Sequence, residues 1–216
     1  MAGQVSYLLM WFAKEDQPTK QAIIGTCAIV GYEKWIVCSG ADFGYDSKDL
    51  EERKPKKEGG KVKQIELDLS IKRTVDVTTP YWMHLWLKNL APPVNAQQTQ
   101  EQYRIEVHTF EGMMPYAGGE SGPFEPKFTA QLPAGGGAAT PIQVVSRYIF
   151  KKAHLTKWSI NLDDQDRPTE SLTFKCSGFA LNFFERTGDD STRNVNSDPA
   201  GWDFGKATGN REWSGR

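Results

Sequence analysis

The sequence predicts a mainly β protein, a barrel or two-sheet sandwich of about seven or eight strands with one inserted helix at about residues 80–90. Two segments, residues 63–73 and 102–110, alternate apolar and polar side chains, as strands with one buried and one solvated face do. Residues 142–160 also alternate, but their apolar parity changes midway, which is typical of a β-bulge where a sheet curves. Only residues 79–91 show helical spacing.

The first and last long strands differ from this simple pattern. Residues 5–13, "VSYLLMWFA", are apolar on both faces, which predicts a central strand, and residues 25–38 are expected to form another strand. Residues 166–185, "DRPTESLTFKCSGFALNFFE", begin with turn residues and then alternate, with Leu172 and Phe174 on one face. The parity flips after Gly178, so that Phe179, Leu181 and Phe183 form the apolar set, and Phe184 is apolar on the opposite face.

The helix has recognisable limits. Thr79 is the expected N-cap, Pro80 the first helical residue, and two prolines at 92–93 stop the helix. Trp82, Leu85, Trp86 and Asn89 form its i, i+3, i+4 stripe, which predicts a short amphipathic helix that covers one end of the sheet structure.

Three segments are predicted to be irregular within a single domain spanning residues 1–216. Residues 41–60 are highly charged and indicate an exposed loop or projecting hairpin. Residues 111–141 are rich in Gly and Pro, which argues against a helix or a long central strand, and the chain end from Asn194 is irregular as well.

Composition excludes several classes of function. The 26 basic and 27 acidic side chains leave a net charge of −1, which argues against a nucleic-acid-binding surface. Three cysteines without a CxxC pair indicate buried, reduced thiols. No apolar run approaches the roughly 18 residues of a membrane span, so no stable membrane insertion is expected. Residues 5–13 lack a preceding Lys or Arg, and "KEDQ" follows them, so no Sec signal peptide is expected.

No catalytic, cofactor or metal site is predicted, and the protein is not expected to be an enzyme. His84, His108 and His154 have no metal-ligand partner at i+2 or i+4. The carboxylates of residues 163–166, "DDQD", are expected to form a solvated turn rather than a Ca²⁺ site. The tryptophans at 11, 35 and 158 are expected in a core or an interface rather than on a sugar-binding platform.

Two quoted segments resemble a known family. "DRPTESLTFKCSGFALNFFE", followed by "GWDFGKATGN", resembles the C-terminal part of Hcp, the tube protein of bacterial type VI secretion systems. "KQIELDLSIKRTVDVTTPYWMHLWLKNL" is similar to the strand, basic step and helix of the family, with Arg73, Val75, Asp76 and Pro80 in corresponding places. "VVSRYIFKKAHLTKWSI" suits the long penultimate strand. The chain is longer than usual, mainly at residues 111–141, and its N-terminal half matches loosely.

The resemblance implies a β-barrel protomer that closes into a homohexameric ring, and rings that stack into a hollow tube. The protein would assemble in the cytoplasm and then be secreted through the injection apparatus. Its partners would be copies of itself, the sheath, spike and baseplate proteins, and small effector proteins in the lumen. Two alternatives stay open: the tail-tube protein of a phage or extracellular contractile injection system, and, in a different class, a monomeric carbohydrate-binding β-sandwich module.

The resemblance also implies two kinds of assembly contact. In the family, a loop near the start of the chain reaches a neighbouring ring, and the matching residues here are Lys48, Asp49, Leu50, Glu51, Glu52, Arg53, Lys54, Lys56 and Lys57. Contacts between subunits within a ring bury strand faces on both sides of a protomer. The residues expected in those faces are Tyr148, Phe150, Phe179, Leu181 and Phe184. The insertion at 111–141 is expected on the outside or rim of the ring.

Overall fold

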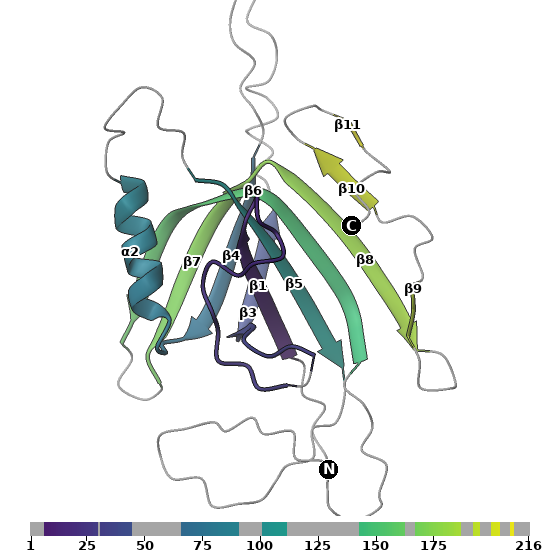
Figure 1. Cartoon of the computed structure of the whole chain (residues 1–216), viewed down its shortest axis with the longest axis horizontal. Helices are drawn as coiled ribbons and strands as arrows, with labels where there is room; N and C mark the ends of the chain where they lie inside the picture. The colour runs from purple at the N-terminus through teal and green to yellow at the C-terminus, as the bar shows by residue number, and fades with distance from the viewer. Residues whose placement is uncertain are drawn as a thin grey trace, which may run out of the picture.

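A computed structural model describes residues 7–29, 31–44, 66–90, 101–111, 143–162, 167–186, 192–194, 200–203 and 208–209. In this part of the chain the protein is mainly β with one helix, as the sequence predicts (Figure 1). Seven strands have five or more residues. The elements are β1 (Tyr7–Lys14), β2 (Ile36–Cys38), β3 (Gly40–Gly44), β4 (Leu67–Thr74), α2 (Thr79–Leu90), β5 (Tyr103–Glu111), β6 (Gln143–Asn161), β7 (Thr169–Cys176), β8 (Gly178–Arg186), β9 (Thr192–Asn194), β10 (Ala200–Asp203) and β11 (Thr208–Gly209).

Antiparallel pairing closes these strands into a barrel. The order is β2–β1–β5–β6–β7–β4–β3, and a single residue, Ser39, joins β2 to β3 and completes the circuit. The 19-residue β6 is long enough to pair with β8 along its first half and with β7 along its second. β8 therefore leaves the barrel on one flank, where it also pairs with β9 and β10. The predicted central position of the first strand is confirmed, since β1 lies between β2 and β5.

The parity change in β6 is a β-bulge, as predicted. Tyr103 of β5 pairs with Ala153 and Ile105 with Phe150, so three residue steps on β6 face two on β5. Lys152 within this bulge has a φ of 51°, and its backbone N–H donates to Glu15 Oε2 at 3.0 Å. The bulge turns β6 so that both Phe150 and Ala153 are buried.

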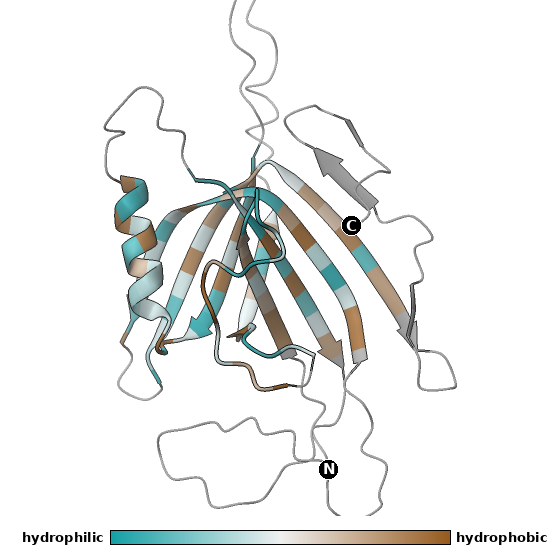
Figure 2. Ribbon diagram, in the orientation of Figure 1, coloured by the Kyte–Doolittle hydropathy of each residue, from teal (hydrophilic) through white to brown (hydrophobic). Residues whose placement is uncertain are grey.

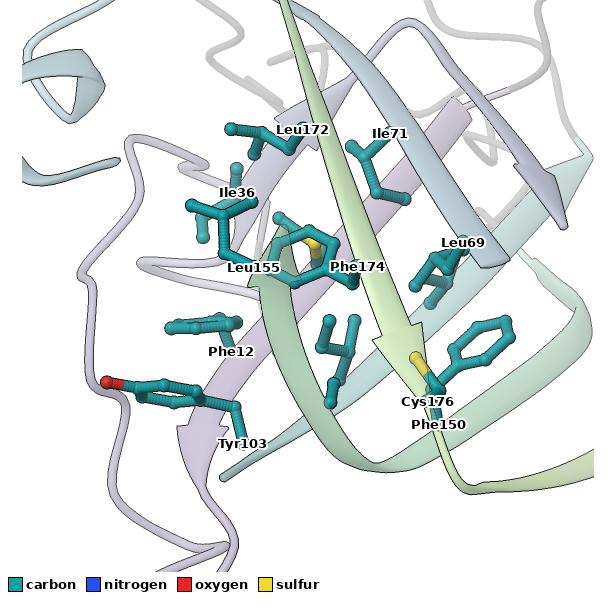
Figure 3. Packing of buried hydrophobic residues seen from close by; sticks show 14 of the residues in the cluster. Phe12, Ile36, Leu69, Ile71, Tyr103, Phe150, Leu155, Leu172, Phe174 and Cys176 are labelled. Carbon is teal, nitrogen blue, oxygen red and sulfur yellow. The ribbon is translucent and has the colours of Figure 1, made fainter. Parts of the chain in front are cut away.

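The main core fills the barrel (Figure 3). Phe12 lies at its centre, stacked on Tyr103 with ring centroids 4.6 Å apart and meeting Trp82 of α2 edge-on at 4.8 Å. Such aromatic pairs stabilise a core beyond the area they bury. Trp82 is fully buried, so α2 covers the core with the apolar stripe that the sequence predicts.

The helix begins one residue earlier than expected. Trp82 N–H donates to the carbonyl of Thr78, so Thr78 takes the N-cap position that was predicted for Thr79. The hydroxyl of Thr79 is instead bonded outside the helix, accepting from Asp76 N–H at 3.1 Å and donating to Glu170 at 2.9 Å. A tertiary contact therefore shifted the start of the helix.

The prediction of a strand over residues 25–38 is wrong for all but its last three residues. Residues 21–29 and 31–35, which we call the strap, fold on themselves: Gly25 N–H donates to Lys34 O at 2.6 Å, and Lys34 N–H to Cys27 O at 2.9 Å. Gly31 and Lys34 have left-handed φ values of 83° and 68°, which a regular strand excludes. The strap covers the outer face of β1 and β5 and builds a second buried cluster there, consisting of Leu9, Cys27, Ile29 and Phe110.

The segments predicted to be irregular are only partly described. Residues 41–44, placed in the charged loop, belong to β3, and the chain end contains β9, β10 and β11, with β10 paired to β8. The prediction for the chain end was wrong because sheet pairing overrode local composition. Residues 41–44 pair antiparallel with β4, as the first arm of a hairpin would, and the charged segment was predicted to be a loop or a hairpin. Residues 45–60, 112–141 and 163–166 lie outside the described residues. Among those described, no helix is long and apolar enough to cross a membrane.

Close packing in the strap leads to a first prediction. A Cβ at Gly25 would lie 2.2 Å from the backbone oxygen of Trp35, whereas one at Gly44 would meet nothing within 4 Å. We expect Gly25→Ala to lower the free energy of unfolding by about 1–3 kcal/mol, because backbone must move. Urea unfolding measures this, with Gly44→Ala as the matched control. Equal stability of the two variants would contradict the packing described.

Candidate assembly surfaces

The predicted ring-stacking loop, with residues Lys48–Lys57, lies outside the described residues, so its role stays a prediction. The predicted strand faces can be placed. One assignment there is wrong: Phe150 is only 1% exposed and belongs to the core of its own protomer. Residues 142–155 carry apolar side chains on both faces, which favoured a contact with a neighbouring subunit, but the sequence did not show whether the protomer or a neighbour buries each of them.

Tyr148 and Phe179 occupy the edge of the same core. Both are half-buried and pack against it, and the ring of Phe43 on β3 lies 5.3 Å from each of theirs. Phe43 itself is exposed. These rings therefore form the place where the barrel core reaches the surface. Phe43 was not among the predicted interface residues, because its segment was taken as part of a loop.

Side chains along β8 become more exposed as the strand leaves the barrel. Phe179 and Leu181 are half-buried and Phe183 is exposed, and all three share one face by alternation. Phe184, on the other face, is half-buried. Phe183 was missing from the predicted interface although its parity matches that of Phe179 and Leu181. The parity was the signal that could have identified it.

α2 has a second apolar face that sequence reasoning missed. Met83, Leu87 and Leu90 are exposed, and their i, i+4, i+7 spacing places them on one side of the helix, away from Trp82 and Leu85. Figure 2 shows hydrophobic, brown bands along α2 among the hydrophilic ones. The same spacing rule that identified the buried stripe could have found this face.

A buried ion pair joins β4 to β7. Arg73 on β4 lies opposite Glu170 on β7, both side chains are 0% exposed, and Arg73 Nε lies 3.3 Å from Glu170 Oε1. Arg73 also forms an ion pair with Asp76 and donates to Thr78 Oγ1 at 2.5 Å. Charges buried this deeply are costly unless an opposite charge lies beside them, so this arrangement has little freedom to change.

Two indole groups complete the network around the pair. Trp158 of β6 donates to Glu170 Oε2 at 3.0 Å, and Trp82 of α2 donates to Thr78 Oγ1 at 3.2 Å. Thr79 contributes its hydroxyl to Glu170 as well. The network thus ties β4, α2, β6 and β7 together. It unites the two segments that carry the resemblance, since Arg73 and Asp76 come from "KRTVDVTTP" and Glu170 from "DRPTE".

A second polar cluster lies under the strap on the outer face of β5 and β6. Arg147 Nη2 lies 2.7 Å from Glu106 Oε2, and Arg104 Nη2 lies 2.8 Å from Glu106 Oε1. Burial alone would raise the pKa of Glu106, but His108 and the two arginines outweigh it and lower that pKa to about 2. Residues 102–110 were predicted to have one solvated face. That expectation was wrong, because the strap packs on the polar face and Glu106 forms ion pairs with both arginines.

The sequence predicts that the histidines do not bind metal and that the cysteines are buried thiols. His108 Nδ1 shares a hydrogen bond of 3.1 Å with the hydroxyl of Tyr32 in the strap, and burial lowers its pKa. All three cysteines are free and buried, and burial raises the pKa of Cys38 to about 12. Within the described ranges, no three His, Cys, Asp or Glu side chains are grouped to hold a metal ion.

The tryptophans do not form a sugar-binding platform in the part of the chain that is described. None of the five whose side chains are described is exposed, and the three predicted to lie in a core or interface pack on other aromatic rings. Trp11 lies against Trp35, with ring centroids 5.5 Å apart, and Trp158 lies against Trp86 at 5.9 Å.

Comparison with known proteins finds solved structures that share this fold. No family model matches the sequence, and no match is found among curated proteins. Among solved structures, one described as a type six secretion system protein has a TM-score of 0.58 at 10% identity, covering 95% of this chain and 100% of its own. Hcp1 of Salmonella typhimurium has a TM-score of 0.52 at 10% identity, covering 97% and 100%. The secreted protein Hcp3 of Pseudomonas aeruginosa has a TM-score of 0.50 at 9% identity, covering 92% and 98%. The predicted Hcp-like fold is confirmed.

The buried ion pair leads to a prediction about stability. We expect Arg73→Met to lower the free energy of unfolding by about 3–5 kcal/mol, because it leaves the buried carboxylate of Glu170 without its cation. Arg73→Met with Glu170→Gln should recover part of this loss. The adjacent Lys72 offers a matched control, since its contact with Asp42 is exposed, and Lys72→Ala should cost less than about 1 kcal/mol. Denaturant unfolding distinguishes these values, and similar losses for Arg73→Met and Lys72→Ala would contradict the assignment.

The cluster under the strap leads us to expect that the folded protein is less stable in acid. The pKa of Glu106 is about 2 in the folded protein against an ordinary value of 4.5, so the folded state favours the charged carboxylate. Its contribution to stability is complete above pH 4.5 and lost as pH falls towards 2, and the lowered pKa of His108 acts in the same direction below 6.5.

We therefore expect wild-type protein to lose stability steadily between pH 6 and 3 in denaturant titrations. Glu106→Gln should be less stable at pH 7 and show a flatter pH dependence, because the titrating carboxylate is gone. Asp42→Asn, which removes an exposed carboxylate, should retain the wild-type profile. A wild-type profile in Glu106→Gln would show that this carboxylate does not cause the acid sensitivity.

Proposed function

We propose that this chain is a structural subunit of the inner tube of a bacterial type VI secretion system, and not an enzyme. Six copies close into a ring, and rings stack into a hollow tube. The observation that carries the proposal is the match to the type six secretion system protein, which extends over 95% of this chain and all of the other. A match of that extent leaves little of the chain for a separate catalytic domain.

The distribution of apolar side chains supports self-assembly. Ring subunits contact each neighbour through a different surface, so they need apolar side chains on two sides of the protomer. Met83, Leu87 and Leu90 on α2 and Phe183 on β8 are exposed in the isolated chain, as expected for surfaces that a neighbour covers. Tyr148, Phe179, Leu181 and Phe184 are retained as proposed contact residues, without the buried Phe150.

The proposed function also implies which partners the subunit has and where it is located. Beyond copies of itself, the subunit would contact sheath, spike and baseplate proteins of the injection machine, and the lumen would hold small effector proteins. It would assemble in the cytoplasm and leave the cell through the apparatus. Lys48–Lys57 would contact the next ring, and the insertion at 111–141 would decorate the outside or rim, since a segment of that size in the lumen would obstruct it.

The first experiment determines the mass of the purified protein by light scattering and images the same fraction by negative stain. We expect ring-shaped particles of about six times the 24.3 kDa protomer mass. A monomer at all accessible concentrations would overturn the proposal, and a saccharide screen by tryptophan fluorescence would then test the carbohydrate-binding alternative.

The loop has its own test. We expect deletion of residues 48–57 to leave single rings intact and to reduce stacking. The deletion removes a weak charged contact from every subunit of the ring, so the summed attraction between rings is lost. Electron microscopy of the variant measures the length of stacks, and a scrambled loop of equal composition serves as the control. Tubes of wild-type length formed by the deletion variant would contradict this role.

A further inference from the structure

The strap closes over a buried histidine. The side chain of His108 on β5 is 12% exposed, and its Nδ1 shares a hydrogen bond of 3.1 Å with the hydroxyl of Tyr32 in the strap. The rings of Tyr32 and Trp35 lie against the imidazole, with centroids 5.6 Å and 4.8 Å from it. Two aromatic side chains of the strap therefore rest on a group whose ordinary pKa lies near neutral pH.

The surroundings of His108 do not accommodate a second proton on the ring. Both oxygens of Glu106 are already engaged, Oε1 by Arg104 at 2.8 Å and Oε2 by Arg147 at 2.7 Å. His108 Nε2 lies 3.8 Å from Glu106 Oε2 and has no hydrogen-bond partner in the part of the chain that is described. Protonation makes both ring nitrogens donors, so it would leave a buried N–H without an acceptor and place a third cation beside one carboxylate.

The other elements packed around His108 supply no compensating charge among the described residues. The carboxylate of Glu33 in the strap accepts from a backbone N–H of its own segment. Leu9 of β1 lies opposite His108, and Asn182 of β8 lies opposite Arg147, so both neighbours in that row are uncharged. Burial, the largest cause, and Arg147 lower the pKa of His108 although Glu106 acts to raise it.

The middle of the strap is attached to the sheet mainly by side chains. The backbone N–H groups of Gly25, Cys27, Lys34 and Trp35 all donate to carbonyls within the strap. At its beginning, Ala22 N–H donates to a carbonyl of β1, and at its end the chain enters β2. Its apolar contacts belong to the second buried cluster rather than to the barrel core. A segment bonded to itself and fixed at both ends can open locally while the barrel stays folded.

We propose that residues 25–29 and 31–35 form a pH-sensitive latch, which lies closed on β5 while His108 is neutral and opens when His108 takes up a proton. Opening lets water solvate the imidazolium and exposes the charged face that carries Arg104, Glu106 and Arg147. All these groups belong to one protomer, so the inference does not rest on the proposed function.

The sign of the pH dependence follows from the two states of the latch. In the open state His108 is solvated and has a pKa near its ordinary value of 6.5, whereas in the closed state its pKa is lower. The closed state is therefore fully favoured above pH 6.5 and loses stability as pH falls below that value. Opening precedes the titration of Glu106, whose ordinary pKa is 4.5, so the latch responds in milder acid than the fold as a whole.

A native thiol under the latch tests the proposal in wild-type protein. Cys27 lies in the second buried cluster, and Cys176 lies in the barrel core as an internal reference. Both are labelled with dithiodipyridine, which reacts in mild acid, at pH 7.5 and pH 5.0, and labelling is measured by peptide mass spectrometry. We expect the rate for Cys27 relative to Cys176 to rise about 5- to 30-fold at pH 5.0, about 30-fold being the limit for an open-state pKa of 6.5. An unchanged ratio would overturn the proposal.

Variants test whether His108 is the group that responds. His108→Gln can still bond to Tyr32 but takes up no charge, so its labelling ratio should be the same at both pH values. Arg147→Gln frees Glu106 Oε2 to accept from protonated His108, so its response should fall to less than half that of wild type. His84→Gln is the matched control, because His84 is exposed on α2, and it should keep the full response.

The variants also separate a loosened strap from a proton-driven one. A wild-type response in His108→Gln, or a lost response in His84→Gln, would assign the opening to another group and overturn the proposal. If His108→Gln is labelled rapidly at both pH values, Arg147→Gln decides, since it keeps the histidine and an undiminished response would overturn the proposal. Circular dichroism at pH 5.0 establishes that the barrel of each variant is folded.

Discussion

The buried pair of Arg73 and Glu170 is the constraint on which the arrangement of the barrel depends. Neither side chain reaches solvent, so each must have its charge balanced inside the protein. The balance requires β4 to pair with β7 in one register, Thr78 and Thr79 to begin α2 beside the pair, and Trp158 of β6 to donate to the carboxylate. A shift of one residue in that register would turn one charge away from the other. The network thereby fixes where α2 covers the core and, with it, which side of the helix faces outward.

The long hairpin formed by β6 with β7 and β8 extends this order to the opposite flank. The change of partner lies at the bulge of β6, where Lys151 pairs with Gly178 of β8 and His154 pairs with Lys175 of β7, so β6 belongs to both sheets. Side chains that belong to the core at Phe150 and Phe179 continue outward to Leu181 and Phe183. The apolar surface of β8 is thus an extension of the core, and an assembly that uses it gains a contact as rigid as the fold itself.

Much of the fold could be predicted because alternation and helical spacing report local geometry. The strands at 67–74 and 143–161, the bulge in the latter and the helix at 79–90 all followed from the period of apolar residues. The strap did not follow, because it contains side chains typical of a strand while its backbone is set by hydrogen bonds within its own segment and by packing on β1 and β5. Glu106 likewise fits a solvated face by pattern, although Arg104, Arg147 and the strap enclose it.

The sequence alone determined the fold class, the two-sided first strand and the resemblance to Hcp, because each depends on residues close together in the chain or on the order of motifs. The tertiary structure decided which apolar residues a neighbour could contact. Phe150 and Phe183 lie on the same face of the β6–β8 pair, since Phe150 pairs with Phe179, yet Phe150 lies inside the barrel and Phe183 is exposed farther along β8. It also brought Arg73 and Glu170 together across 97 residues of chain, since the barrel must close before the two charges meet.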